Sequence, residues 1–174
     1  MQTLVQHLSK YAAYHRDKRN VVTHYVGVPM IVAAVVASLS RPAFAHVGGV
    51  TLSPALIAVG ISALFYLKLD IRFGIVMSVF LAACLWVGQL LAVAPTAIWL
   101  SWSIGVFVVG WVIQFIGHYY EGKKPAFLDD ISGLIIGPIF VAAELAFELG
   151  LRKDVQDAVE ARVGPTFIRQ ARVA

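Results

Sequence analysis

The sequence predicts an all-α protein: a polytopic membrane helix bundle with four transmembrane helices, an amphipathic helix at the N-terminus and an interfacial or re-entrant helix near the C-terminus. Of its 174 residues, 59% are hydrophobic and only 14% are charged, whereas soluble domains carry about 25% charged residues. The stretch from residue 20 to residue 120 contains only four charges: Arg41, Lys68, Asp70 and Arg72. Such a stretch is expected to face lipid. The composition therefore argues against a secreted domain, a nucleic-acid reader and a disordered tail.

The lengths of the uncharged runs place the four membrane spans. A bilayer core of roughly 30 Å needs about 20 helical residues. The run from residue 73 to residue 120 has no formal charge and is long enough for two spans, with Ala94-Pro95-Thr96 as the turn between them. The predicted spans are residues 22–40, 53–68, 72–93 and 97–121.

The two ends of the chain are expected to lie at the membrane surface. The first nineteen residues are amphipathic. Residues 131–150 are apolar but contain Gly137-Pro138 and two carboxylates four residues apart, Glu144 and Glu148. These features favour an interfacial or re-entrant helix over a fifth span. A polar tail follows at residues 151–174, and the whole chain is read as one integral-membrane domain, residues 1–174.

The basic residues predict the orientation of the bundle. With four spans, 13 of the 14 lysines and arginines fall on the side that carries both termini, and Arg41 lies opposite. The positive-inside rule then places both termini in the cytoplasm, at a bacterial inner membrane or an endoplasmic reticulum membrane. The sequence pI of about 9.4 is assigned to these flanking residues, so no nucleic-acid partner is expected.

Three of the five histidines are predicted to converge. His15, His24 and His118 lie at the cytoplasmic ends of the first and fourth spans, whereas His46 falls in an outer loop and His7 in the N-terminal segment. Three histidines at the same membrane depth, in a chain with so few polar residues, indicate a functional site more than three separate structural roles. His15 and His24 are nine residues apart, half a turn out of phase on one helix. A helix break near Asn20, a good N-cap residue, would let both face one metal.

Polar residues near His118 extend this predicted site. Glu121 is three residues further along and shares its helix face, and Gln114 lies one turn earlier. Glu121 is interpreted either as part of the site or as a solvated residue at the helix end. Glu144 is interpreted either as a supporting partner of the histidines or as a residue facing the headgroups. Neutral imidazoles with a carboxylate nearby suit Fe(II), Zn(II) or Mn(II).

Three blocks of sequence also carry a family resemblance. They are YAAYHRDKRNVVTHYVGVP at residues 11–29, QFIGHYYEGKKPA at residues 114–126 and GPIFVAAE at residues 137–144. Together and in this order they resemble a family of small membrane proteins that includes the fungal Fe(II)-dependent 2-hydroxy fatty acid dioxygenase of phytosphingosine breakdown. The resemblance spans about residues 8 to 148.

The resemblance implies an activity, a cofactor and substrates. The activity is α-oxidation, in which a 2-hydroxy fatty acid reacts with O₂ and yields a fatty acid shortened by one carbon. The implied cofactor is Fe(II), held by His15, His24 and His118. These three histidines and Glu121 are the predicted catalytic residues. The acyl chain of the substrate would lie between the helices, with its charged head at the cytoplasmic boundary, and membrane lipid is a further expected partner. The supporting or carboxylate-binding residues are expected to be Tyr14, Arg16, Asn20, Gln114 and Glu144, with Lys68, Arg72 and Lys123 as further candidates for the substrate carboxylate.

Two other functions fit the residues. A zinc-dependent membrane lipid hydrolase would use the same ligand types. A non-catalytic scaffold or transport subunit would need no metal, although a transporter is expected to carry polar groups near the bilayer midplane. The sequence leaves the oligomeric state open.

Overall fold

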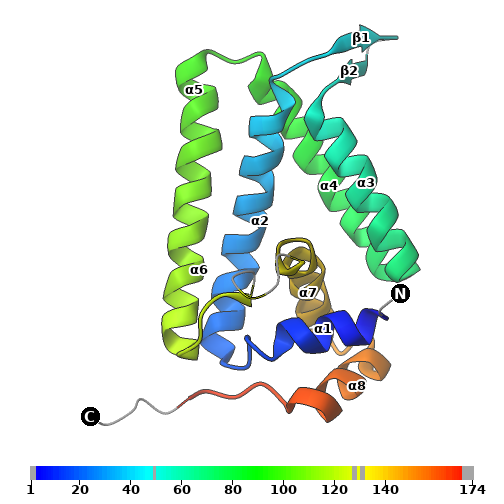
Figure 1. Ribbon diagram of the computed structural model, residues 1–174, viewed down its shortest axis with the longest axis vertical. Coiled ribbons are helices and arrows are strands. Elements are labelled where there is room, and N and C mark those ends of the chain that lie inside the picture. Colours follow the sequence, from blue (N-terminus) through cyan, green and yellow to red (C-terminus); the bar gives the residue numbers. More distant parts are fainter. Residues whose placement is uncertain (1–2, 49, 127–128, 130–131, 170–174) are drawn as a thin grey trace. The chain divides into compact units, whose positions relative to one another are not determined.

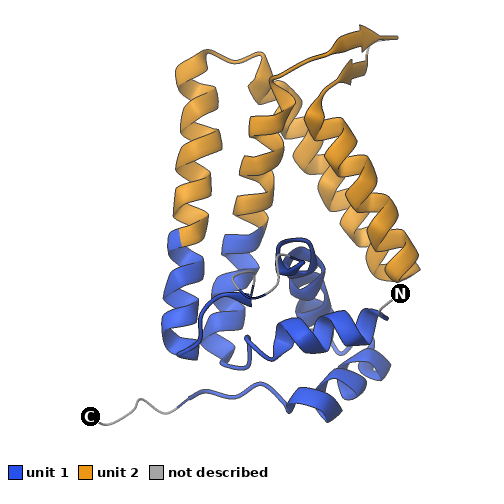
Figure 2. Ribbon diagram, viewed as in Figure 1, with its two compact units in different colours: residues 1–28, 112–174 blue, residues 29–111 orange. Residues whose placement is uncertain are grey.

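The computed structural model describes residues 3–48, 50–126, 129 and 132–169. These residues are mostly helical, and the only sheet among them is a hairpin of two short strands. The predicted all-α class is therefore confirmed. The chain divides into two compact units (Figure 2): residues 1–28 with 112–174, and residues 29–111. The reading of the chain as one domain stays a prediction.

The first unit contains the two ends of the chain (Figure 1). It consists of α1 (Leu4–Ala12), the start of α2 (Lys18–Ser40), the end of α6 (Phe107–Glu121), α7 (Gly133–Glu148) and α8 (Lys153–Val163). Thr3 and Gln6 cap α1 reciprocally, and Leu4, Leu8 and Ala12 are buried along one face, the spacing of an amphipathic helix. Helix α1 packs on α7 and α8, so the predicted N-terminal amphipathic helix is confirmed.

Helices α7 and α8 form a bent pair. Gly150 and Arg152 take the left-handed conformation, with φ of 72° and 53°, and the helix axes on either side differ by 111°. Left-handed residues commonly end helices. The predicted helix at residues 131–150 is thus found as α7, and the predicted polar tail begins with the short charged helix α8.

The second unit contains a tight helical hairpin. It comprises the rest of α2, strands β1 (Ala45–Val47) and β2 (Val50–Leu52), helices α3 (Pro54–Leu69), α4 (Ile71–Ala92) and α5 (Thr96–Leu100), the π-helix η1 (Ser101–Val106) and the start of α6. Asp70 ends α3, and its carboxylate accepts hydrogen bonds from the first backbone N–H groups of α4. Gly74 permits close packing, since a Cβ there would lie 2.5 Å from Leu67 Cα.

Three helical stretches are long and apolar enough to cross a membrane, and they match three predicted spans. They are α2, α4 and the continuous stretch Thr96–Glu121 formed by α5, η1 and α6. The fourth predicted span, residues 53–68, is found as α3, which has 16 residues where about 20 are needed for a straight crossing. Ser53 and Asp70 cap the two ends of α3 and fix this length. A membrane crossing by α3 therefore stays a prediction.

The β1–β2 hairpin was not predicted. Its strands have three residues each and pair in antiparallel register from Ala45–Leu52 to Val47–Val50. Gly48, with φ of 55°, allows the turn. Strands of three residues are too short to show the alternation of apolar and polar side chains by which a strand is recognised in a sequence. His46 lies on β1, exposed, with Nδ1 3.1 Å from the Thr51 hydroxyl.

Candidate metal centre

His15, His24 and His118 meet inside the first unit. His15 lies in the loop between α1 and α2, His24 on the second turn of α2 and His118 near the end of α6. One ring nitrogen from each lies within 4.8 Å of the other two, and the ring centroids are 4.5, 4.9 and 5.2 Å apart. All three side chains are buried. The structure therefore brings together the three histidines that the sequence analysis selected, and separates His46 from them in the chain's other compact unit.

Hydrogen bonds fix the tautomers of two of these rings. His15 Nδ1 lies 2.7 Å from the Tyr11 carbonyl oxygen, and His24 Nδ1 lies 2.8 Å from the Asn20 carbonyl oxygen. A carbonyl oxygen only accepts, so each Nδ1 donates and, in a neutral ring, each Nε2 carries a lone pair. The two Nε2 atoms are 3.0 Å apart. Two lone pairs at this distance repel each other unless a proton or a cation lies with them.

The donor set fits a divalent transition metal. Imidazole nitrogens bind such ions at about 2.0–2.1 Å, so nitrogens 3.0 Å apart can contact the same ion. His118 Nδ1 is buried and has no hydrogen-bond partner within the described part of the chain. Burial also lowers the pKa of His15 well below its ordinary value, which favours the neutral, ligand-competent ring. Backbone carbonyls that orient metal-binding imidazoles are the usual supporting partners.

The last turn of α1 places an aromatic ring, that of Tyr11, against His15. The Tyr11 and His15 rings are parallel within 2° and their centroids are 4.2 Å apart. Phe140 packs against both rings, at 4.9 and 5.5 Å. The predicted helix break is present, but α2 begins at Lys18. Asn20 therefore lies in the first turn of α2, and the prediction that it acts as an N-cap is wrong.

Gly117 allows α6 to approach α2 at the level of the histidines. A Cβ at this position would lie 2.0 Å from Thr23 Oγ1 and 2.5 Å from Asn20 Oδ1. A side chain at this position would therefore force the side chains of Thr23 and Asn20 to move. Gly117 precedes His118, and Thr23 precedes His24, so this close contact brings the two ligand-bearing helix turns together. The sequence analysis did not select Gly117; its place beside His118 in an apolar helix was the available signal.

Glu121 is completely buried and serves as an anchor for the His15 loop. Its Oε2 accepts hydrogen bonds from the backbone N–H groups of Arg16 and Asp17, at 2.9 and 2.7 Å, and from Asn20 Nδ2 at 3.3 Å. Its Oε1 lies 3.2 Å from the Arg169 guanidinium. With both oxygens engaged, Glu121 is not a solvated residue at the helix end. Its contacts are those of a positioning residue, and a direct catalytic role stays a prediction.

Arg16 and Glu144 form a buried ion pair beside the histidines. The two side chains are 3.2 Å apart. Every nitrogen of the Arg16 guanidinium donates: Nε to the Ala12 and His15 carbonyls, one terminal nitrogen to the Gly164 carbonyl and the other to Glu144. These contacts pair the Arg16 charge with Glu144 inside the protein, and binding of a substrate carboxylate by Arg16 stays a prediction. They also show Glu144 facing the protein and not the headgroups.

The remaining residues predicted to support the site or bind the substrate carboxylate are not all close to the histidines. Asn20 Nδ2 also donates to the Tyr14 carbonyl at 3.3 Å, and the Tyr14 hydroxyl donates to Asp129 at 2.9 Å. Gln114 is buried on α6 one turn before His118. Lys123 donates to the Ala13 carbonyl at 2.7 Å. Thus Asn20 and Tyr14 shape the loop. Lys68 and Arg72 belong to the other compact unit.

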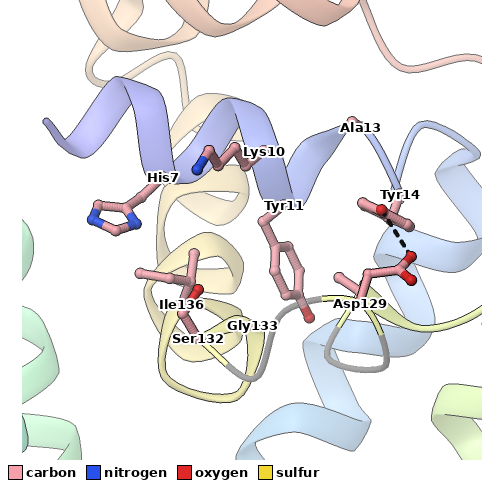
Figure 3. Close-up of a pocket in the computed structure, with 10 residues that line it drawn as sticks. His7, Lys10, Tyr11, Ala13, Tyr14, Asp129, Ser132, Gly133 and Ile136 are labelled. Carbon is pink, nitrogen blue, oxygen red and sulfur yellow. Dashed lines mark hydrogen bonds between the residues drawn. The ribbon is translucent and has the colours of Figure 1, made fainter. Parts of the chain in front are cut away.

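A cavity of about 350 Å³ lies between α1 and the start of α7 (Figure 3). Its wall is formed by His7, Lys10, Tyr11, Ala13, Tyr14, Ala126, Asp129, Ser132, Gly133 and Ile136. The Tyr11 ring is part of this wall and also stacks on His15. Lys10 is exposed and forms no ion pair or hydrogen bond with the described residues. The sequence analysis missed Lys10, because a lysine on an amphipathic helix carries no signal of its own.

Comparison with known proteins agrees with the resemblance. The family described as "2-hydroxy-palmitic acid dioxygenase Mpo1-like" matches residues 1–149. The chain is 28% identical over 155 residues to the 2-hydroxy-palmitic acid dioxygenase MPO1 of Saccharomyces cerevisiae, an alignment that covers 88% of this chain and 85% of the yeast protein. No solved structure matches the chain. The predicted family resemblance is thereby confirmed.

The close contact at Gly117 predicts a costly substitution. Gly117→Ala should lower the free energy of unfolding by about 1–3 kcal/mol, the usual cost of overpacking, and should reduce metal content by moving His118. Thermal unfolding in detergent and metal analysis measure both effects. Gly60→Ala is the matched control, because a Cβ there has no atom within 4 Å and alanine favours a helix. Equal unfolding temperatures for the two variants would contradict the prediction.

The contacts of Glu121 predict a large loss of stability on its removal. Glu121→Ala leaves buried N–H donors without an acceptor and should lower the free energy of unfolding by roughly 3 kcal/mol or more. Denaturant unfolding of the purified protein measures this loss. Glu148→Ala is the control, since this exposed glutamate should change stability by less than about 0.5 kcal/mol. A Glu121→Ala protein as stable as the control would rule out the anchoring role.

Proposed function

Because the chain belongs to the Mpo1-like family, we propose that it is a dioxygenase that shortens 2-hydroxy fatty acids by one carbon and uses Fe(II) held by His15, His24 and His118. The observation that carries the proposal is the pair of Nε2 atoms 3.0 Å apart, each with its proton on Nδ1. The unpartnered His118 nitrogen supports it. A relative that acts on 2-hydroxy-palmitic acid supports the substrate class.

The reaction balances without a separate reductant. A 2-hydroxy acid, R–CH(OH)–COOH, and O₂ give R–COOH, CO₂ and H₂O, so the acid loses four electrons and O₂ gains four. Bound iron would supply the redox chemistry that lets O₂ react with an organic acid. The residues of this chain bind and orient the two reactants and keep bulk water away, since the three imidazoles are buried.

The cavity of Figure 3 is proposed to admit the polar end of the substrate. It shares the Tyr11 ring with the histidine cluster, so a ligand in the cavity is separated from His15 by one aromatic ring. The Lys10 ammonium, unpaired among the described residues, is the proposed counter-charge for the carboxylate. Arg16 is not proposed for this role, because its charge is already paired with the buried carboxylate of Glu144.

The distribution of lysine and arginine indicates on which side of the membrane the site lies. The excess of lysine and arginine on the side of the termini supports a cytoplasmic location for both of them. His15 lies in the first unit together with both termini. We therefore propose that the reaction takes place at the cytoplasmic face of the membrane.

Metal analysis tests the proposed function against its alternatives. Purified protein should hold close to one iron per chain after anaerobic loading with Fe(II), and His118→Ala should lose most of it. The loaded protein should then consume one O₂ and release one CO₂ for each 2-hydroxypalmitate converted. Tightly held zinc, with ester or amide hydrolysis and no O₂ uptake, would favour the hydrolase. Failure to bind either metal would leave the scaffold as the better explanation.

The position of Lys10 predicts a defect in substrate binding. Lys10→Gln should raise KM for 2-hydroxypalmitate about tenfold with little change in kcat, since an interaction made equally in the ground and transition states affects KM alone. Steady-state O₂ consumption measures both constants. Lys153→Gln, which removes an exposed lysine from α8, is the control. A fall in kcat with unchanged KM would show that Lys10 does not bind the carboxylate.

A further inference from the structure

Residues 164–169, here called the C-terminal strap, run beside the loop that carries His15. Asp17 and Phe167 form a parallel β-bridge. The Phe167 N–H donates to the Arg16 carbonyl at 2.9 Å, and the Lys18 N–H donates to the Phe167 carbonyl at 3.0 Å. The strap follows α8 and passes the start of α2 (Figure 1). Two backbone hydrogen bonds thus hold the peptide immediately after His15.

Side chains strengthen this contact at both ends of the strap. At its start, the Arg16 guanidinium donates to the Gly164 carbonyl at 2.9 Å. At its end, the Arg169 N–H donates to the Asp17 carboxylate at 3.0 Å, and Arg19 donates to the Arg169 carbonyl at 2.9 Å. The Asp17 carboxylate also forms an ion pair with the Arg19 guanidinium at 2.7 Å. Hydrogen bonds to an ionised group are stronger than those between neutral groups.

The strap also supplies the positive charge that pairs with Glu121. The Arg169 guanidinium contacts Glu121 Oε1 at 3.2 Å, while the other oxygen accepts the N–H groups of Arg16 and Asp17. Glu121 has no exposed surface, and a buried carboxylate without a counter-charge is costly. Arg169 is an ion-pair partner of Glu121, which lies one turn from His118. The strap therefore contacts the neighbours of two of the three histidines.

We infer that the C-terminal strap positions His15 for metal binding, with Phe167 and Arg169 as its positioning residues. The inference rests on the proposed metal site. It concerns a segment outside the family match, which ends at residue 149. His15 is the one member of the cluster that does not lie on a helix. The backbone that follows it, residues 16–18, is held both by Glu121 and by the strap, so releasing the strap should free His15 more than His24 or His118.

The expected effect is on metal affinity. Groups that orient a metal ligand without binding the metal typically contribute 10–100-fold to affinity. Arg169→Gln should therefore weaken Fe(II) binding about tenfold, and a stop codon after Val163, which removes the whole strap, should weaken it by up to about a hundredfold. Arg169→Lys, which keeps the positive charge, should restore part of the affinity. The histidines themselves are unchanged in all three proteins.

The experiment is an anaerobic Fe(II) titration of the full-length protein in detergent, beside matched controls. Arg162→Gln removes an exposed arginine from α8, and a stop codon after Arg169 shortens the chain but keeps the strap. Both should bind Fe(II) as the wild type does. Unfolding of the metal-free proteins is measured in parallel, because a purely structural role would lower the unfolding temperature without a separate loss of affinity in folded protein.

Hydrogen exchange of the Arg16 and Asp17 amides gives a readout that needs no metal. These amides donate to Glu121 and not to the strap, so faster exchange in Arg169→Gln would show that the loop itself is loosened. If the wild type binds no Fe(II), the proposed function fails and this exchange still decides the positioning role. Unchanged exchange, or Fe(II) affinity equal to that of Arg162→Gln, would overturn the inference.

Discussion

A single buried carboxylate, Glu121, constrains the first unit of the molecule. It has no exposed surface, and an ionised carboxylate in such a place must be surrounded by donors. The donors come from two segments far from Glu121 in sequence: residues 16–20, which supply two backbone N–H groups and the Asn20 side chain, and Arg169, which supplies its guanidinium. The need to satisfy one charge therefore draws the loop, the start of α2 and the C-terminal strap to the end of α6.

The geometry of the histidines follows from this constraint. His118 lies on the same helix face as Glu121, and the loop held by Glu121 includes His15. His24 is brought close by a different means, the contact of α2 with α6 at Gly117. The backbone carbonyls of Tyr11 and Asn20 then select the tautomer of two rings. Helix packing thus sets the distances, and backbone hydrogen bonds set which nitrogens face the centre.

The sequence was sufficient for the features that depend on composition and helical spacing. It predicted α2, α4 and the stretch ending at Glu121 as apolar spans, and it selected the histidines that meet. It did not predict the role of Glu121 or the strap, because both depend on contacts across about 50 to 150 residues of chain. It also did not predict that Arg16 pairs with Glu144, since a pairing across more than 100 residues leaves no local signal.

The charges around the histidines leave a specific task for the substrate-binding residues. Arg16, Arg19 and Arg169 are paired with Glu144, Asp17 and Glu121 within the described chain. This polar network is internally neutral, so it can hold a neutral imidazole cluster in place without attracting an acid from solution. In the proposed function, a carboxylate substrate would find its counter-charge at the bound metal ion and at Lys10 on the cavity wall. If the proposal holds, buried ion pairs give the site its shape, and a separate exposed lysine beside Tyr11 binds the charged end of the substrate.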